Sequence, residues 1–177
     1  MAGKIREDRD FIPVRIAVLT VSDTRTFETD KSGQTLADFI TNAGHILANR
    51  QIIPDDRNEI AAQLRTWIKQ ENVDVILTTG GTGITGRDVT PEAVRDVIEL
   101  EIPGFGELFR MLSYAKIGSS TIQSRALAGR TGNTLIFALP GSTGACKDAW
   151  NDILQYQLDS RFGPCNFVEL MPRFTET

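Results

Sequence analysis

Short apolar segments alternate with amphipathic ones along this chain, and that alternation restricts its fold more than any other feature. Residues 15–21 (RIAVLTV), 73–78 (VDVILT) and 134–139 (TLIFAL) are apolar and rich in β-branched side chains, as strands buried on both faces are. A weaker strand is expected at residues 46–53. Because helical segments separate these strands, we expect a mainly parallel sheet that is covered by helices on both faces.

The helical segments are marked by apolar residues three and four positions apart. They are expected around residues 36–43, where Gly44 would end the helix, around 60–68, over 92–100 and 105–115, and along the apolar face made by Cys146, Ala149, Trp150, Ile153, Leu154 and Leu158. Residues 1–177 fit one domain. Within it, residues 1–12 and 163–177 are expected to be terminal arms, either loose or packed on a neighbouring subunit.

Charge and cysteine content exclude several classes of function. The net charge is −4, so no nucleic-acid partner is expected, because phosphates favour a basic surface. Two cysteines and one histidine are too few for a zinc site of Cys and His ligands or for a disulfide framework. Neither a signal peptide nor an apolar run near the roughly 20 residues that span a bilayer is visible. We therefore expect a cytoplasmic protein with no membrane partner.

Small and polar residues follow every predicted strand. They are Ser22, Asp23 and Thr24 after the first, Pro54, Asp55 and Asp56 after the second, Gly80, Gly81, Thr82 and Gly83 after the third, and Pro140, Gly141, Ser142 and Thr143 after the last. The carboxyl ends of parallel strands meet at one edge of a sheet, and ligands bind there. A binding site is predicted at this edge.

The stretch at residues 78–93 (TTGGTGITGRDVTPEA) mixes residues needed for folding with others. Thr90 is expected to cap the next helix, with Pro91 at its first position and Glu92 near the positive end of its dipole. Gly81, Gly83 and Gly86 match the G-x-G-x-x-G pattern after a strand, but the match is weak evidence for a dinucleotide fold because residues 87–89 separate the glycines from the helix. No Gly-Lys-Ser/Thr follows, so the stretch is not a P-loop. The glycines either serve a tight turn or bring backbone amides close to phosphate oxygens.

The acids of this edge differ in how well folding explains them. Asp56, with Glu59 three positions later, resembles a capping box and would start a helix. Asp55 and Asp88 have no visible structural task. Two carboxylates on neighbouring loops can share a Mg²⁺, which binds oxygen ligands, waters and substrate phosphates. From the residues alone, Asp55 and Asp88 either hold a metal ion or occupy ordinary surface positions.

Other chemically versatile residues have simpler interpretations. Cys146, Trp67 and Trp150 are expected in the core, on the apolar faces of helices. His45 has no neighbour with which it could form a nucleophile–base pair. Ser124 follows a hydroxyl-rich run that is either plain loop or an anion contact.

Seven short motifs follow one another between about residues 14 and 160, and GGTG followed five residues later by DVTPEA is the most specific pair. The motifs are VSDT, DKSG, TTGGTG, RDVTPEA, PGFGE, SRA and the PGS turn. Together they resemble the molybdopterin-binding MogA/MoaB family of molybdenum cofactor biosynthesis. FRMLSYAKIG, STIQSRALAG, PGSTGACKDAW and PCNF resemble its MoaB branch. Thr143 replaces the second proline of the family's Pro-Gly-x-Pro turn and is able to cap the next helix.

The resemblance implies a three-layer α/β/α domain that assembles as a homotrimer or homohexamer. It also implies that ATP adenylylates molybdopterin and releases pyrophosphate, with Asp55 and Asp88 as the functional acids beside Mg²⁺. The nucleotide and pterin sites would be lined by Ser22, Asp23, Asp30, Ser32, Gly33, Gly80, Gly81, Thr82, Gly83, Ser124, Pro140, Gly141 and Ser142. One alternative is a protein that holds molybdopterin without adenylylating it; another is a CinA-type domain that acts on other nucleotides.

The segment at residues 102–122 carries more apolar side chains than one helix needs to cover a sheet. Leu108, Met111, Leu112 and Ala115 form one helical stripe, and Phe105, Phe109 and Leu112 form a second beside it. Large apolar surfaces of this kind usually mark interfaces. We therefore expect this segment to pack between subunits.

Overall fold

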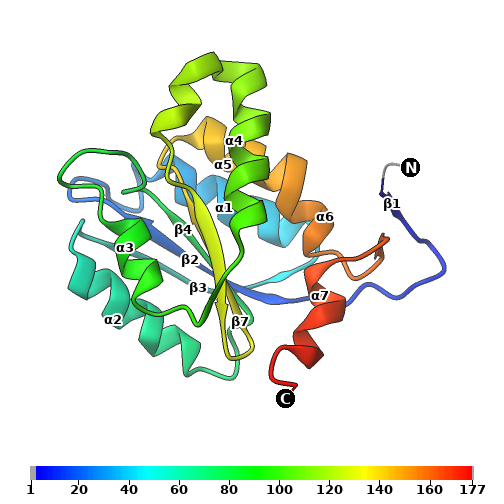
Figure 1. Cartoon of the computed structure of the whole chain (residues 1–177). Coiled ribbons are helices and arrows are strands. Elements are labelled where there is room, and N and C mark those ends of the chain that lie inside the picture. Colours follow the sequence, from blue (N-terminus) through cyan, green and yellow to red (C-terminus); the bar gives the residue numbers. More distant parts are fainter. Residues whose placement is uncertain (1–2, 177) are drawn as a thin grey trace.

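A computed structural model describes residues 3–176 and contains one six-stranded sheet with helices on both faces (Figure 1). Its strands, in the order β3-β2-β4-β7-β6-β5, are β2 (Arg15–Val21), β3 (Ile46–Ile53), β4 (Val75–Thr79), β5 (Leu100–Glu101), β6 (Leu127–Thr131) and β7 (Thr134–Leu139). Strands β3, β2, β4 and β7 are parallel, and β6 is antiparallel to both of its neighbours. The expected three-layer, mainly parallel α/β fold is confirmed.

The helices divide into two layers (Figure 1). One face of the sheet is covered by α1 (Lys31–Asn42), α4 (Pro103–Ile117), α5 (Thr143–Ala149) and α7 (Phe167–Leu170), and the other by α2 (Arg57–Ile68) and α3 (Thr90–Arg95). Successive residues of β2 point to opposite layers, so that Ile16 packs in the first and Ala17 in the second. Because both layers exclude water, the central strands are mainly apolar.

The helix expected over residues 92–100 is wrong in its extent. Helix α3 ends at Arg95, and β5 begins five residues later. The backbone amides of Glu99 and Ile102 donate to β6 carbonyls, and Ile98 lies against Gly129, where any side chain would collide with it. Sheet pairing therefore takes the chain out of the helix. Strand β6 was not predicted, because Gly129 and Arg130 interrupt its apolar pattern.

The last helical segment has its predicted apolar face, because all six of its marker residues are buried. Helix α5 continues through a π-helical turn, η2 (Trp150–Leu154), into α6 (Gln155–Gln157). The expectation that Thr143 caps α5 is wrong. Ser142 is the N-cap, and its hydroxyl accepts a 3.2 Å hydrogen bond from the amide of Ala145.

The terminal segments of the described chain lie beside each other (Figure 1). Strand β1 (Lys4–Ile5) pairs antiparallel with β8 (Phe162–Gly163), and the ring of Phe167 packs 5.8 Å from that of Phe137. Short 3₁₀ segments, η1 (Gly118–Gln123) and η3 (Met171–Arg173), complete the structure. The predicted arms include residues 1, 2 and 177, which lie outside the described residues.

Helix α4 and η1 project from the body of the molecule (Figure 1), and their apolar residues divide into buried and exposed sets. Phe105 and Phe109 are buried against the sheet. The exposed set consists of Leu108, Met111, Tyr114, Ile117 and Ile122, and we call it the α4–η1 face. No helix within residues 3–176 is long and apolar enough to cross a membrane.

The two edges of the sheet differ in length. Strand β5, at one edge, has only two residues. Strand β3, at the other edge, has eight, and its pairing with β2 is irregular: Ile16 lies opposite Leu47, but Ala17 lies opposite Asn49. Ala48 is therefore an extra residue that bulges out of the ladder.

Candidate functional site

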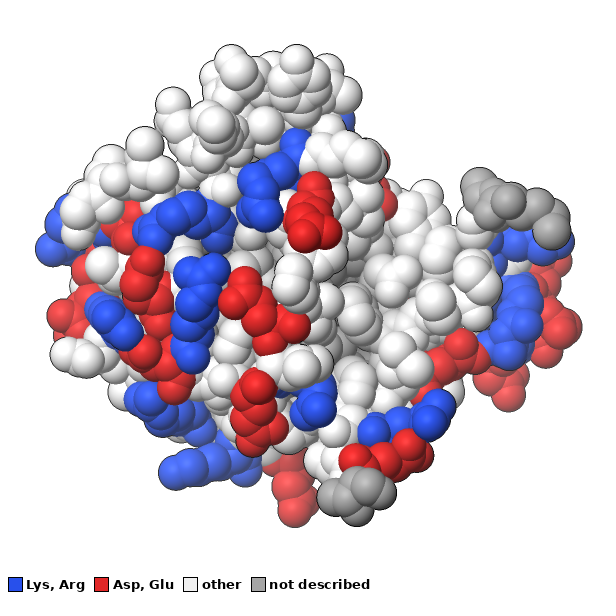
Figure 2. Space-filling model, in the orientation of Figure 1, with Lys and Arg blue, Asp and Glu red and all other residues white. Residues whose placement is uncertain are grey.

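A cavity of about 540 Å³ lies at the carboxyl ends of β2, β4 and β7, the edge that the sequence predicts. Its lining consists of Val21, Ser22, Thr24, Arg25, Asp55, Gly80, Gly81, Thr82, Gly83, Arg87, Asp88, Gln123, Ser124, Pro140 and Gly141. Charged side chains of both signs gather on the side of the molecule that carries α3 and the loop after β4, whereas the surface over the top of α4 is almost uncharged (Figure 2).

Glycine is required where the strand ends converge. Gly80 has φ +111°, and a side chain there would lie 2.2 Å from the carbonyl oxygen of Val21 in β2. The Cα of Gly80 in turn occupies the space beside Gly141, which follows β7. These residues thus let three loops meet at van der Waals distance. The tight-turn interpretation applies at Gly80, and the same backbone forms a wall of the cavity.

The cavity brings together ten of the residues that the sequence singles out. They are Ser22, Asp55, Gly80, Gly81, Thr82, Gly83, Asp88, Ser124, Pro140 and Gly141. Asp23 lies beside it, where its carboxylate accepts from the Asp55 amide at 3.1 Å and pairs with Arg87. Asp30, Ser32, Gly33 and Ser142 lie outside the lining. Sequence reasoning did not include Arg25, Arg87 or Gln123 among the site residues.

Asp55 is half-buried between other acids, directly before Asp56. Burial, followed by the nearby negative charge of Asp23, raises the pKa of Asp55 above its ordinary value, and the charge of Asp88 acts in the same direction. Arg87 opposes the shift. Asp56 itself accepts hydrogen bonds from the amides of Asn58 and Glu59, which confirms it as the cap of α2. A cation or a proton at Asp55 would relieve the repulsion.

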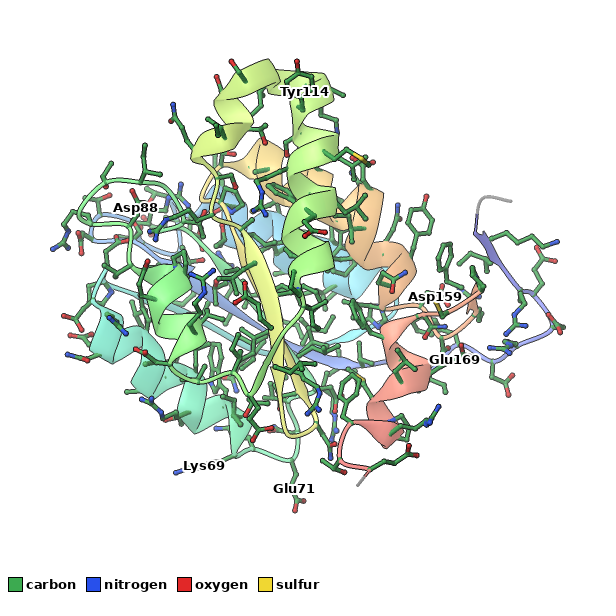
Figure 3. The ribbon with its side chains drawn as sticks, in the orientation of Figure 1. Lys69, Glu71, Asp88, Tyr114, Asp159 and Glu169 are labelled. Carbon is green, nitrogen blue, oxygen red and sulfur yellow. The ribbon has the colours of Figure 1, made fainter. Side chains whose placement is uncertain are left out.

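Asp88 closes its own loop, so the interpretation that it has no structural task is wrong. Its Oδ2 accepts from the Thr85 amide at 2.9 Å and from the Thr85 hydroxyl at 2.6 Å. Burial acts to raise the pKa of Asp88, but these bonds and one from the Gly83 amide outweigh it, and the pKa falls below its ordinary value. Figure 3 shows Asp88 on the opposite side of the molecule from Lys69 and Glu71.

Arg125 holds the loop from outside. Its amide donates to Thr82 O at 2.9 Å, and its guanidinium donates to Gly83 O at 2.6 Å and to Asp88 O at 2.5 Å. The same guanidinium pairs with Glu92 at the start of α3. These contacts connect the carbonyls of the loop to the segment that follows η1. The SRA motif contains Arg125, but the motif alone does not predict these hydrogen bonds.

Thr90 does not cap α3, contrary to expectation. Val89 is the N-cap and makes no side-chain cap bond, whereas Thr90 is the first residue of the helix. The amide of Thr90 donates to Gly81 O at 3.0 Å, which ties the helix start to the cavity wall. Its hydroxyl is buried and has no hydrogen-bond partner in the described part of the chain.

Asp30 is 1% exposed and is satisfied by internal donors. It accepts from the Thr20 hydroxyl at 2.7 Å, the Gly33 amide at 2.9 Å and Arg50 Nη2 at 3.1 Å. Burial acts to raise the pKa of Asp30, but the combined hydrogen bonds and the charge of Arg50 lower it overall. Asp30 therefore stabilises the start of α1.

Arg25 connects this buried network to the cavity. One of its Nη atoms donates to the Ser32 hydroxyl at 2.6 Å, and the other donates to Gly141 O at 2.9 Å. Its guanidinium also lies 3.6 Å from Asp30. Asp30 and Ser32 thus reach the cavity wall through a basic side chain.

The residues expected in the core lie there. Trp67, Trp150 and Cys146 are buried, and burial raises the pKa of the Cys146 thiol to about 11. His45 is buried, and its Nδ1 accepts from the Val14 amide at 3.3 Å. Within residues 3–176, no group of three or more His, Cys, Asp or Glu side chains is arranged to hold a metal ion.

Comparisons with known proteins agree on one family. Residues 17–160 match the model described as probable molybdopterin binding domain. The chain is 52% identical over 158 residues to molybdenum cofactor biosynthesis protein B of Escherichia coli K12, which covers 89% of this chain and 93% of that protein.

Two solved structures extend the likeness to the fold. A crystal structure of molybdenum cofactor biosynthesis protein B superposes with a TM-score of 0.82 at 48% identity, covering 85% of this chain and 94% of the other. The tungsten cofactor synthesizing protein MoaB from Pyrococcus furiosus superposes with a TM-score of 0.71 at 37% identity, covering 80% and 91%.

Proposed function

The chain belongs to the molybdopterin-binding domain family of molybdenum cofactor biosynthesis, and from this premise we propose that it adenylylates molybdopterin with Mg-ATP. The observation that carries the proposal is the position of Asp55. It lines the cavity, half-buried, and its pKa is raised by burial and by the neighbouring acids Asp23 and Asp88. A half-buried carboxylate near like charges is suited to binding a cationic ligand, and it contributes little to the stability of the fold.

The donor set of the cavity fits Mg²⁺, which takes one or two carboxylates and completes its shell with water and phosphate oxygens. Asp55 and Asp88 would hold the ion, and it would supply positive charge to the phosphates of ATP. Arg25 and Arg87 line the same cavity and add positive charge from the protein. The backbone at Gly81 and Gly83 allows phosphate oxygens to approach closely.

In the proposed reaction, an oxygen of the terminal phosphate of molybdopterin forms a bond to the α-phosphorus of ATP. The bond from that phosphorus to the β-phosphate oxygen breaks, and pyrophosphate leaves. The residues of the cavity hold the two phosphates in line and stabilise their charge, which is how proteins accelerate such transfers.

The proposal is tested by incubating the protein with molybdopterin, ATP and Mg²⁺ and measuring adenylylated molybdopterin and pyrophosphate. We expect turnover in the wild type and a loss of roughly a hundredfold or more in D55N. D56N is the matched control, because the neighbouring Asp56 caps α2 and does not line the cavity. Equal turnover in D55N and D56N would rule out a catalytic role for Asp55.

One observation favours a second candidate, a protein that holds molybdopterin without adenylylating it. The hydrogen bonds from Thr85 explain Asp88 through folding alone, so its presence does not by itself indicate catalysis. On this alternative the wild type would bind molybdopterin tightly, release no pyrophosphate, and keep that affinity in D55N.

We also propose that the protein self-associates as a homotrimer, or as a homohexamer of two trimers, through the α4–η1 face. Met111 is 64% exposed and Ile122 is 82% exposed, and the visible surface over the top of α4 carries almost no charge (Figure 2). Sedimentation equilibrium at micromolar concentration should give a multiple of the 19.5 kDa chain. M111E should shift the mass toward the monomer, because it places a charge in the apolar contact. A wild-type mass near 19.5 kDa would contradict the proposal.

A further inference from the structure

The hydroxyl of Thr90 is an unsatisfied polar group beside Gly81, a residue that lines the cavity. Thr90 is fully buried, and its Oγ1 has no hydrogen-bond partner among residues 3–176. A buried hydroxyl in this condition destabilises the folded chain, and valine would fill the same space without that cost. Since Val89 occupies the N-cap position of α3, the hydroxyl is not explained by helix capping either.

Two side-chain oxygens converge beside Gly81. A side chain at this position would meet Thr90 Oγ1 at 2.4 Å and Asp55 Oδ1 at 3.0 Å, so both oxygens border the same small space next to the Gly81 Cα. Gly81 also has φ +63°, which favours glycine, and its carbonyl accepts from the Thr90 amide. The main chain of Thr90 is therefore held in place, and rotation of its side chain can redirect the hydroxyl.

We propose that Thr90 is a positioning residue for Asp55. When a ligand occupies the cavity, the Thr90 hydroxyl donates a hydrogen bond to the Asp55 carboxylate across the space that Gly81 leaves open. A hydroxyl–carboxylate bond is charge-assisted and therefore strong, and it fixes the direction in which the second carboxylate oxygen faces the ligand. This role rests on the proposed function, in which Asp55 acts on the metal–phosphate assembly.

The test compares T90V, T90S and T78V with the wild type in the molybdopterin adenylylation assay. T90V removes the hydroxyl at nearly constant shape, and turnover should fall about tenfold while the thermal midpoint stays unchanged or rises. T90S keeps the hydroxyl and should restore most of the turnover. Thr78 offers a matched control, because its hydroxyl is also buried and without a partner in the described residues, but it lies within β4 and does not border the space beside Gly81. T78V should match the wild type.

A second measurement tests whether Thr90 acts through Asp55. Calorimetry should show that T90V weakens Mg-ATP binding in the wild-type background and has no further effect in D55N. An equal loss of Mg-ATP affinity in both backgrounds would overturn the proposal. So would wild-type turnover in T90V, or equal impairment of turnover in T90S and T90V. A large loss of stability in T90V would also overturn it.

These outcomes are separable from failure of the proposed function. A wild type that binds Mg-ATP without releasing pyrophosphate would refute adenylylation. The calorimetric comparison of T90V in the wild-type and D55N backgrounds would still decide the role of Thr90. A wild type that neither turns over nor binds Mg-ATP would overturn both proposals.

Discussion

Asp30 and Asp55 occupy similar places in the fold and very different environments. Each lies where a loop enters a helix, Asp30 as the cap of α1 and Asp55 one residue before the cap of α2. Asp30 is buried, and Thr20, Gly33 and Arg50 donate to it. Asp55 is half-buried near two further acids, and its pKa is raised where that of Asp30 is lowered.

The difference separates a carboxylate that completes the fold from one that is available to a ligand. A buried charge is tolerated when hydrogen bonds and an opposite charge surround it, and the folded state then depends on that charge. A carboxylate crowded by like charges costs free energy when ionised, so its presence is better explained by a ligand that supplies positive charge. Residue type is the same and position in the loop is similar in the two cases. Only the hydrogen-bond donors and charges around each carboxylate distinguish them.

The largest effect on stability is expected for D30N. Asparagine keeps the shape and the capping oxygen but removes the charge that Arg50 faces, and we expect a loss of about 3 kcal/mol in the free energy of unfolding. Urea denaturation measures it. Because the pKa of Asp30 is lowered on folding, its contribution is present above the unfolded pKa of about 4 and disappears as the pH falls through the folded pKa. D30N should therefore weaken the acid sensitivity of the wild type.

A smaller loss is expected for D88N. The asparagine oxygen accepts weaker bonds from Thr85 than the carboxylate does, so the free energy of unfolding should fall by about 1–2 kcal/mol.

D55N, in contrast to D88N, should leave stability unchanged or raise it, since it removes a carboxylate whose ionisation is disfavoured. Urea curves of the two variants measured side by side check the ranking. A D55N protein less stable than D88N would reverse our assignment of the two acids.

The smallest loss of stability is expected for D56A. It removes the side chain that caps α2, which costs about 1 kcal/mol, and the proposed adenylylation should be mostly retained because Asp56 lies outside the cavity lining. Thermal unfolding and turnover measured on the same preparation test both parts. If D56A lost turnover as D55N is expected to, the cavity would depend on the start of α2 rather than on Asp55.

The sheet and most of its helices followed from periodicity. Strands β2, β3 and β7 have their predicted bounds, because burial on both faces leaves an uninterrupted apolar pattern in β2 and β7. The hairpin partner β6 did not follow, since its small Gly129 is explained only by the contact with Ile98. The short α3 is likewise set by pairing between residues distant in the sequence.

The candidate site was predictable in position but only partly in its chemistry. The strand ends identified the cavity edge, and ten of the expected residues line it. The tasks of Asp88, Arg125 and Thr90 depend on hydrogen bonds between loops, which no local pattern records. The motif containing Thr90 is typical of a helix start and predicts that its hydroxyl caps α3, whereas Val89 takes the N-cap position.

The bulge at Ala48 bears on how copies of the chain can meet. Strand β3 is an eight-residue outer strand, and the backbone groups of such a strand can add the strand of another molecule and extend the sheet into an aggregate. The extra residue interrupts the regular spacing of those groups. At the opposite edge, β5 is too short to act as a template. The fold thus resists open-ended growth through its sheet, and the proposed self-association through the helical α4–η1 face would be closed and of fixed size.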